Sequence, residues 1–171
     1  MVGRVRAAAG VVVGAGLAAA ALSYARLSPQ EEVTLLAWND AAVVFRGQAL
    51  YSARCAACHG IHGEGQSTAS DPASSTPPAP PHDASGHTWR HPDFALIQLT
   101  KSGASDVTCL ELDENAMPRF EQTLTDRDVI DVLSYIKSTW PPEIRAQQDA
   151  VNRLYGSQNA AVRDLLDLKD G

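Results

Sequence analysis

The chain has 171 residues, of which 44% are hydrophobic and 20% are charged, and its formal net charge is −6. This length suits one domain with a hydrophobic core and short appendages rather than two full domains. The composition is that of an acidic folded protein, which argues against intrinsic disorder and against a nucleic-acid partner.

The N-terminus predicts export from the cytoplasm. Arg4 and Arg6 precede an uncharged run of sixteen residues, 7–22, that is rich in Ala and Gly. This length lies between the apolar core of a signal peptide and the roughly 17–25 residues that span a bilayer. Two interpretations stay open: a signal peptide cleaved after Ala21 or Ala25, or a single membrane anchor over residues 7–25. We favour the anchor, which holds the rest of the chain on the periplasmic side of a bacterial inner membrane; a cleaved signal peptide would release it into the periplasm.

The segment over residues 1–27 is therefore the signal peptide or anchor. We divide the rest of the chain into a spacer over 28–39, a helical domain over 40–141 and a polar helical tail over 142–171.

The first helix of the domain is predicted over residues 40–54, with Asp40 as its N-cap. Small and apolar residues, among them Gly47 and Tyr51, recur at steps of three and four, which places them on one helical face. That face requires a partner helix.

The sequence Cys55-Ala56-Ala57-Cys58-His59 follows this helix and is the attachment signature of c-type haem. Its two thiols add to the vinyl groups of the porphyrin, and the adjacent histidine binds the iron. A redox-active dithiol would normally open a helix after a strand, and a zinc site would need a second group of ligands. A disulfide between the two cysteines would close too small a ring to stabilise the fold much. Covalent haem is the interpretation that the motif favours over all three.

Residues 67–88 are rich in Ser, Thr, Ala, Gly and Pro, and four of the five residues at 77–81 are proline. Proline lacks the backbone N–H donor that a helix interior or a central strand requires. We expect a long loop that wraps the cofactor, with a surface insertion as the alternative for 67–76.

Further helices are predicted on both sides of the next loop and in the tail. One begins at Pro92 and ends near residue 102, and another begins at Thr125, where Asp128 completes an approximate capping box, and ends near residue 139. The tail adds two polar helices, which the sequence places at 142–154 and 158–168. No segment alternates between apolar and polar residues as a strand does, so the predicted fold class is all-α.

Met117 is the second of the two methionines in the chain, and Met1 is the initiator. Because a haem that only carries electrons needs a second axial ligand, and thioether sulfur favours ferrous iron, Met117 is the candidate for that ligand. The alternative is that Met117 only fills the core. Cys109 is left without a partner and is expected to be a buried thiol or to form an intermolecular bridge.

In their order along residues 40–141, these features resemble class I cytochromes c, the His/Met family of small helical electron carriers. The resemblance rests on Gly47 and Tyr51 before the haem motif, a proline-bearing loop, Met117-Pro118, and a final helix. It implies the cytochrome c fold, with three or more helices around one covalently bound haem c. In this fold the first and last helices cross closely, so Gly47 would let their backbones approach.

The resemblance also assigns roles to residues around the haem. Tyr51 would pack near Val132 and Tyr135 in the final helix. The axial histidine would donate a hydrogen bond from Nδ1 to a proline carbonyl, for which Pro80 is the best candidate and Pro81 the next. Trp89 would lie near a haem propionate, although a place in the core is an equal alternative.

The function implied is electron transfer between a redox donor and an acceptor, with membrane complexes of a bacterial respiratory or related chain as the expected partners and no enzymatic activity. Residues 40–141 contain seven Lys and Arg against thirteen Asp and Glu, so these partners should present a basic or apolar surface. Two alternatives stay open: a haem subunit of a membrane oxidase or dehydrogenase, and a haem enzyme or sensor whose sixth iron position is free.

Overall fold

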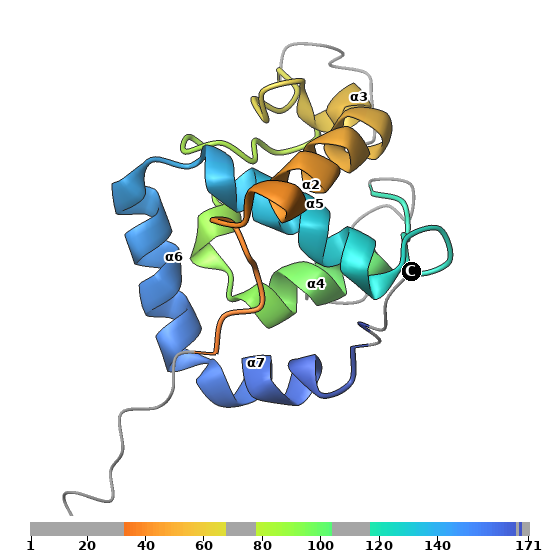
Figure 1. Ribbon diagram of the computed structural model, residues 1–171. Coiled ribbons are helices and arrows are strands. Elements are labelled where there is room, and N and C mark those ends of the chain that lie inside the picture. Colours follow the sequence, from red (N-terminus) through yellow and green to blue (C-terminus); the bar gives the residue numbers. More distant parts are fainter. Residues whose placement is uncertain (1–32, 68–77, 104–116, 167, 169–171) are drawn as a thin grey trace, which may run out of the picture. The chain divides into compact units, whose positions relative to one another are not determined.

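The computed structural model describes residues 33–67, 78–103, 117–166 and 168. Residues 32–171 form one compact unit (Figure 1), which we describe by itself. The predicted signal peptide or anchor lies outside the described residues, as does Cys109. No helix within the described ranges is both long and apolar enough to cross a membrane.

The described parts of the chain are helical and contain no strand, which confirms the all-α prediction. The elements, in chain order, are α2 (Ala41–Arg54), α3 (Ala56–His59), the 3-10 helix η1 (Thr88–Arg90), α4 (Asp93–Ser102), α5 (Asp126–Thr139), α6 (Pro142–Leu154) and α7 (Gly156–Arg163).

The helix ends are set by the capping residues that the sequence indicates. Asp40 accepts hydrogen bonds through its side chain from the backbone N–H groups of Ala42 and Val43 at the start of α2. Thr125 and Asp128 form a reciprocal capping box at the start of α5, as predicted. Both caps satisfy backbone donors that the first helical turn leaves without partners.

The crossing of α2 and α5 is the closest helix contact around which the domain is built (Figure 1). A Cβ atom placed on Gly47 would lie 1.9 Å from the backbone oxygen of Asp131 and 2.9 Å from Cβ of Tyr135. Only glycine fits there, so the predicted role of Gly47 is confirmed. One turn further along α2, the ring of Tyr51 lies 5.4 Å from the ring of Tyr135, measured between centroids.

The hydrophobic core lies between α2, α4 and α5 and continues to the segment before α2 and to the end of α5. Its buried members are Leu36, Tyr51, Leu96, Ile97, Leu124, Val129, Val132, Leu133, Ile136 and Trp140. Leu36 belongs to the segment that we predicted to be a spacer, yet it is 4% exposed.

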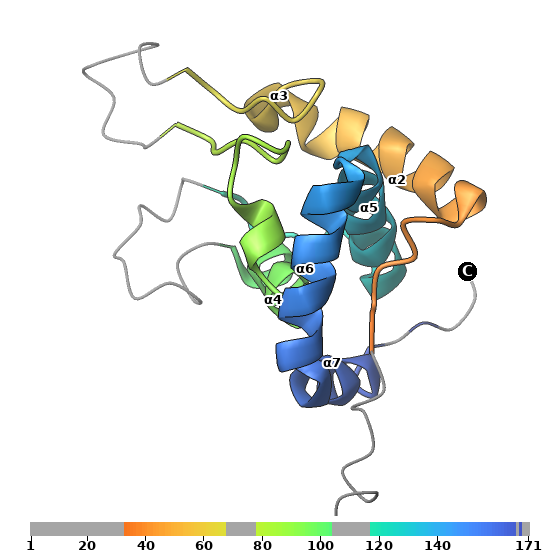
Figure 2. The same ribbon diagram turned by 90° about the vertical axis from the view of Figure 1, so that its left-hand side faces the viewer.

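Residues 33–39 and the helices α6 and α7, which we predicted to be a spacer and a tail, pack in the same compact unit as residues 40–141. The two tail helices exist, as predicted. Their contacts with the domain are made mainly by polar side chains: Gln148, Asn152 and Asn159 are all fully buried. α6 packs against η1 and α7 packs against α4, and Figure 2 shows α7 at the lower end of α6.

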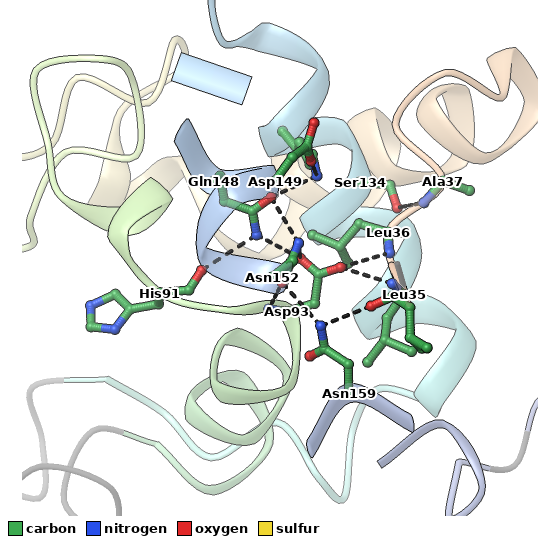
Figure 3. A network of polar contacts seen from close by, with 12 residues as sticks. Leu35, Leu36, Ala37, His91, Asp93, Ser134, Gln148, Asp149, Asn152 and Asn159 are labelled. Atoms are coloured by element: carbon green, nitrogen blue, oxygen red, sulfur yellow. Dashed lines mark hydrogen bonds and ion pairs between the residues drawn. The ribbon is translucent and has the colours of Figure 1, made fainter. Parts of the chain in front are cut away.

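Gln148 and Asn152 converge on Asp93, the first residue of α4, which is also fully buried (Figure 3). Its Oδ1 accepts hydrogen bonds from Gln148 and Asn152, and its Oδ2 accepts from the backbone N–H groups of Leu35 and Leu36. A sequence pattern based on apolar periodicity does not detect such a contact, since every member of the network is polar or backbone.

Candidate haem-binding site

The haem motif lies at the junction of α2 and α3. Cys55 is the C-cap of α2, and its N–H donates a hydrogen bond to the Tyr51 carbonyl at 2.9 Å. The same residue is the N-cap of α3. His59 closes this short helix with a hydrogen bond from its N–H to the Cys55 carbonyl, also at 2.9 Å. The single helical turn fixes the spacing between the two cysteines and the histidine.

Neither thiol of the motif is in a disulfide. Cys55 is partly buried and Cys58 is exposed. Burial, with a smaller contribution from Cys58, raises the pKa of Cys55 to about 11, so that its sulfur is uncharged in this environment.

His59 is held in one tautomer. Its ring is 8% exposed, and its Nδ1 lies 2.9 Å from the carbonyl oxygen of Pro80. A carbonyl only accepts hydrogen bonds, so Nδ1 carries the proton and Nε2 keeps its lone pair. Burial lowers the pKa of His59, which favours this neutral form. A metal-binding histidine needs both the neutral form and this second hydrogen bond.

The contact with Pro80 is the one that the resemblance implied. The loop containing it is fixed by neighbouring backbone bonds, from the N–H of Gly65 to the His59 carbonyl at 2.7 Å and from the N–H of Gln66 to the Ala79 carbonyl at 2.9 Å. Tyr51 adds a hydrogen bond from its hydroxyl to the Gly60 carbonyl, which ties α2 to the segment after the motif.

His82 is part of this environment and was not identified in the sequence. Its ring is stacked on that of His59, with 3.9 Å between centroids and 23° between planes. Its Nδ1 lies 2.8 Å from Oγ1 of Thr88, and its carbonyl accepts a hydrogen bond from Nε1 of Trp140 at 2.7 Å. Burial, with His59 and His87 nearby, lowers the pKa of His82 to about 3.

This stacking argues against His82 as the sixth iron ligand. Two imidazoles on opposite sides of one metal ion have their binding nitrogens about 4 Å apart, since each bond is about 2 Å long. Their ring centres must then be further apart than their nitrogens, whereas the two centroids are only 3.9 Å apart. In this arrangement His82 packs against the His59 ring, and the two imidazoles would not face each other across an iron ion.

Trp89 provides a test of whether the surrounding residues fit a haem. Its indole N–H is buried, and it has no hydrogen-bond partner among the residues that the structure describes. A buried donor of this kind costs free energy unless something accepts its hydrogen. A haem propionate is an acceptor of the right type, so the orphaned N–H fits the role that the resemblance assigned to Trp89.

Met117 lies between α4 and α5, in a loop that is described from residue 117 onward. The Met117 carbonyl is 3.1 Å from where a Cβ on Gly103 would be, and the following residues bond to the end of α4 through the N–H of Phe120 and the Thr100 carbonyl at 3.4 Å. These contacts position the loop backbone. Iron binding by the Met117 sulfur stays a prediction.

A small cavity of about 180 Å³ lies beside Tyr51 and His82, between the end of α5 and the segment after the haem motif. It is lined by Tyr51, His62, Gly63, His82, Tyr135, Ile136 and Thr139.

Comparison with known proteins agrees with this geometry. The family model for cytochrome c matches residues 44–140, more than half of the chain, with nearly the boundaries predicted for the domain. A search of curated proteins found no match, and neither did a search of solved structures. The chain therefore belongs to the cytochrome c family, binds haem c covalently and has a role in haem-based electron transfer.

Proposed function

We propose that this chain is an electron carrier without enzymatic activity, which passes electrons between redox proteins on the periplasmic side of a bacterial inner membrane. The observation that best supports this proposal is the His59 tautomer, because the bond from Nδ1 to Pro80 leaves Nε2 free to bind iron. When bound, haem supplies one-electron exchange at its iron.

In this function the protein's residues hold the cofactor and exclude water. Cys55 and Cys58 supply the covalent attachment, His59 supplies one axial ligand, and Met117 is the proposed second ligand. A closed sixth position leaves no room for a substrate at the iron, which distinguishes a carrier from a haem enzyme or sensor.

An optical spectrum of the purified holoprotein in both redox states tests this proposal. We expect a weak band near the red end of the ferric spectrum, from charge transfer between thioether sulfur and iron. A high-spin ferric spectrum without that band would show an open or differently occupied sixth position and would refute the carrier assignment. Covalent attachment is tested separately: haem that extracts completely into acidified organic solvent is not bonded to the cysteines.

For location, we propose that residues 7–25 remain as a membrane anchor. This proposal is supported by the sequence alone, through its uncharged run behind Arg4 and Arg6. Membrane fractionation at high salt and N-terminal sequencing of the protein from its native host test it. A soluble form that begins near Leu22 or Arg26 would refute the anchor and leave the haem assignment unchanged.

The proposed partners are membrane-bound redox complexes of a respiratory or related chain, with basic or apolar docking surfaces. Tethering would raise the local concentration of the haem domain near such complexes, so that weak and brief contacts suffice for electron flow. Stopped-flow electron transfer at increasing ionic strength tests the charge argument. A rate with a basic partner that does not fall as salt is added would contradict it.

A further inference from the structure

One end of the domain exposes several large apolar side chains. Leu154 at the end of α6 is 79% exposed, and Leu165, just after α7, is 84% exposed. Tyr155 between the two helices and Leu168 are each 41% exposed. We call these four residues the α7 surface. Docking on an apolar phase would remove these side chains from water.

The N-terminal segment joins the domain at this same end. Asn159 in α7 donates a hydrogen bond from Nδ2 to the Val33 carbonyl at 2.9 Å, and the N–H of Asn159 bonds to the Tyr155 carbonyl at 3.0 Å. The first described residue of the domain is therefore within one helical turn of the α7 surface.

Chain length limits how far this end can be from a membrane. If the anchor ends at Ala25, only the residues from Arg26 to Val33 connect it to α7, and fully extended they span about 25 Å. The end of the domain at Val33 would therefore be the part of it that the anchor keeps closest to the bilayer.

Charge favours the same orientation. Residues 142–171 contain four Lys and Arg and five acidic residues, a net charge of −1, whereas residues 40–141 have a net charge of −6. An anionic phospholipid surface therefore repels residues 40–141 more strongly than it repels the C-terminal region.

We propose that the α7 surface docks on the phospholipid bilayer, with its leucines in the interfacial region and Tyr155 at the headgroup level. This inference rests on the membrane attachment proposed above. Figures 1 and 2 both show α3, which ends at His59, at the opposite end of the domain from α7. Docking would therefore hold the haem-attachment segment away from the bilayer, where redox partners can reach it.

Spin labels on the full-length holoprotein test this orientation. Ala161 on α7 and Ala49 on α2 are both exposed helical alanines, so cysteine variants at these two positions form a matched pair. Each is made in a Cys109→Ser background, labelled with a nitroxide, and reconstituted into vesicles of phosphatidylcholine and phosphatidylglycerol. Collisions of the label with a water-soluble nickel chelate and with lipid-soluble oxygen are then measured by electron paramagnetic resonance.

We expect the vesicles to lower the nickel accessibility of the label at position 161 several-fold and to leave the label at position 49 unchanged. Combining Leu154→Asp with Leu165→Asp should abolish this protection. Phe45→Asp, which changes another side chain that is 73% exposed, should have no effect.

Three results would overturn the docking. If the protein floats with the vesicles at high salt but the label at 161 stays accessible to nickel, the attachment holds and the docking is wrong. If the protein does not float with vesicles at high salt, the attachment fails, and the docking that rests on it fails too. If position 161 is protected in native membranes but not in protein-free vesicles, a protein rather than lipid covers the α7 surface.

Discussion

Replacing Gly47 with alanine tests the helix crossing on which the haem motif depends. The substitution adds one carbon atom, which would lie 1.9 Å from the Asp131 carbonyl oxygen and 2.6 Å from the carbonyl carbon. Both of these atoms are backbone, so no side-chain rotation relieves the overlap. The two helices must separate by more than 1 Å, a rough estimate from ordinary contact distances.

Two effects of opposite sign determine how much the free energy of unfolding changes in Gly47→Ala. Alanine favours a helix over glycine by about 1 kcal/mol, which stabilises the variant. Overpacking in a core typically costs about 1–3 kcal/mol, and a clash with fixed backbone lies at or above the upper end of that range. We expect a net loss of about 2 kcal/mol in the free energy of unfolding, equivalent to roughly 8 °C in Tm for a domain of this size.

Urea and thermal unfolding of the holoprotein, followed by circular dichroism, measure this loss. Gln48→Ala is the matched control, since it places alanine at the neighbouring, exposed position of α2 and should change stability by less than about 0.5 kcal/mol. If Gly47→Ala unfolds together with the parent protein, α2 and α5 do not cross as closely as the structure shows.

Three further substitutions test other parts of the argument. Met117→Ala should leave a folded haem protein with a lower reduction potential, because the ligand that favours ferrous iron is lost; an unchanged potential in redox titration would assign the sixth ligand elsewhere. Trp89→Phe should destabilise the holoprotein by about 1–2 kcal/mol if the indole N–H donates to a propionate. If urea unfolding shows that the substitution leaves the stability unchanged or raises it, the indole N–H has no hydrogen-bond partner in the holoprotein either. Asp93→Ala should cost about 3–5 kcal/mol because four hydrogen-bond donors, three of them buried, lose the Asp93 carboxylate as acceptor. Asp164→Ala, at an exposed site, should cost almost nothing, and equal urea midpoints for the two variants would contradict the network.

The confirmed predictions are those that depend on residues close together in the sequence or on a family motif. Asp40 and the pair of Thr125 and Asp128 cap helices because their side chains reach nearby N–H groups, which sequence spacing alone establishes. The role of Gly47 followed from a glycine within the apolar face of a helix, and the bond between His59 and Pro80 followed from the family resemblance.

The polar contacts at the two ends of the domain were not predicted, because their members are far apart in the sequence. Asp93 and Asn152 are separated by 59 residues, and Val33 and Asn159 by 126. The spacing of Gln148 and Asn152 at four residues was nevertheless a detectable signal, since it places two uncharged amides on one side of the predicted helix over 142–154. An analysis of apolar periodicity predicts that this side is exposed to solvent, because its residues are polar.

One of these amides, Gln148 in α6, also links α5 to the segment that contains Trp89. Gln148 donates to the His91 carbonyl at 3.3 Å and accepts from the fully buried Lys137 of α5 at 2.6 Å. The segment that ends at His91 contains Trp89, and Trp140 holds its other end through the His82 carbonyl. The loop beside the axial histidine is thus fixed from α5 and α6 at both ends. Because hydrogen bonds require a defined direction and distance, whereas apolar contacts do not, this arrangement holds the loop in one position. Loosening α6 should therefore disturb the haem environment, even though α6 contains none of the residues predicted to touch the cofactor.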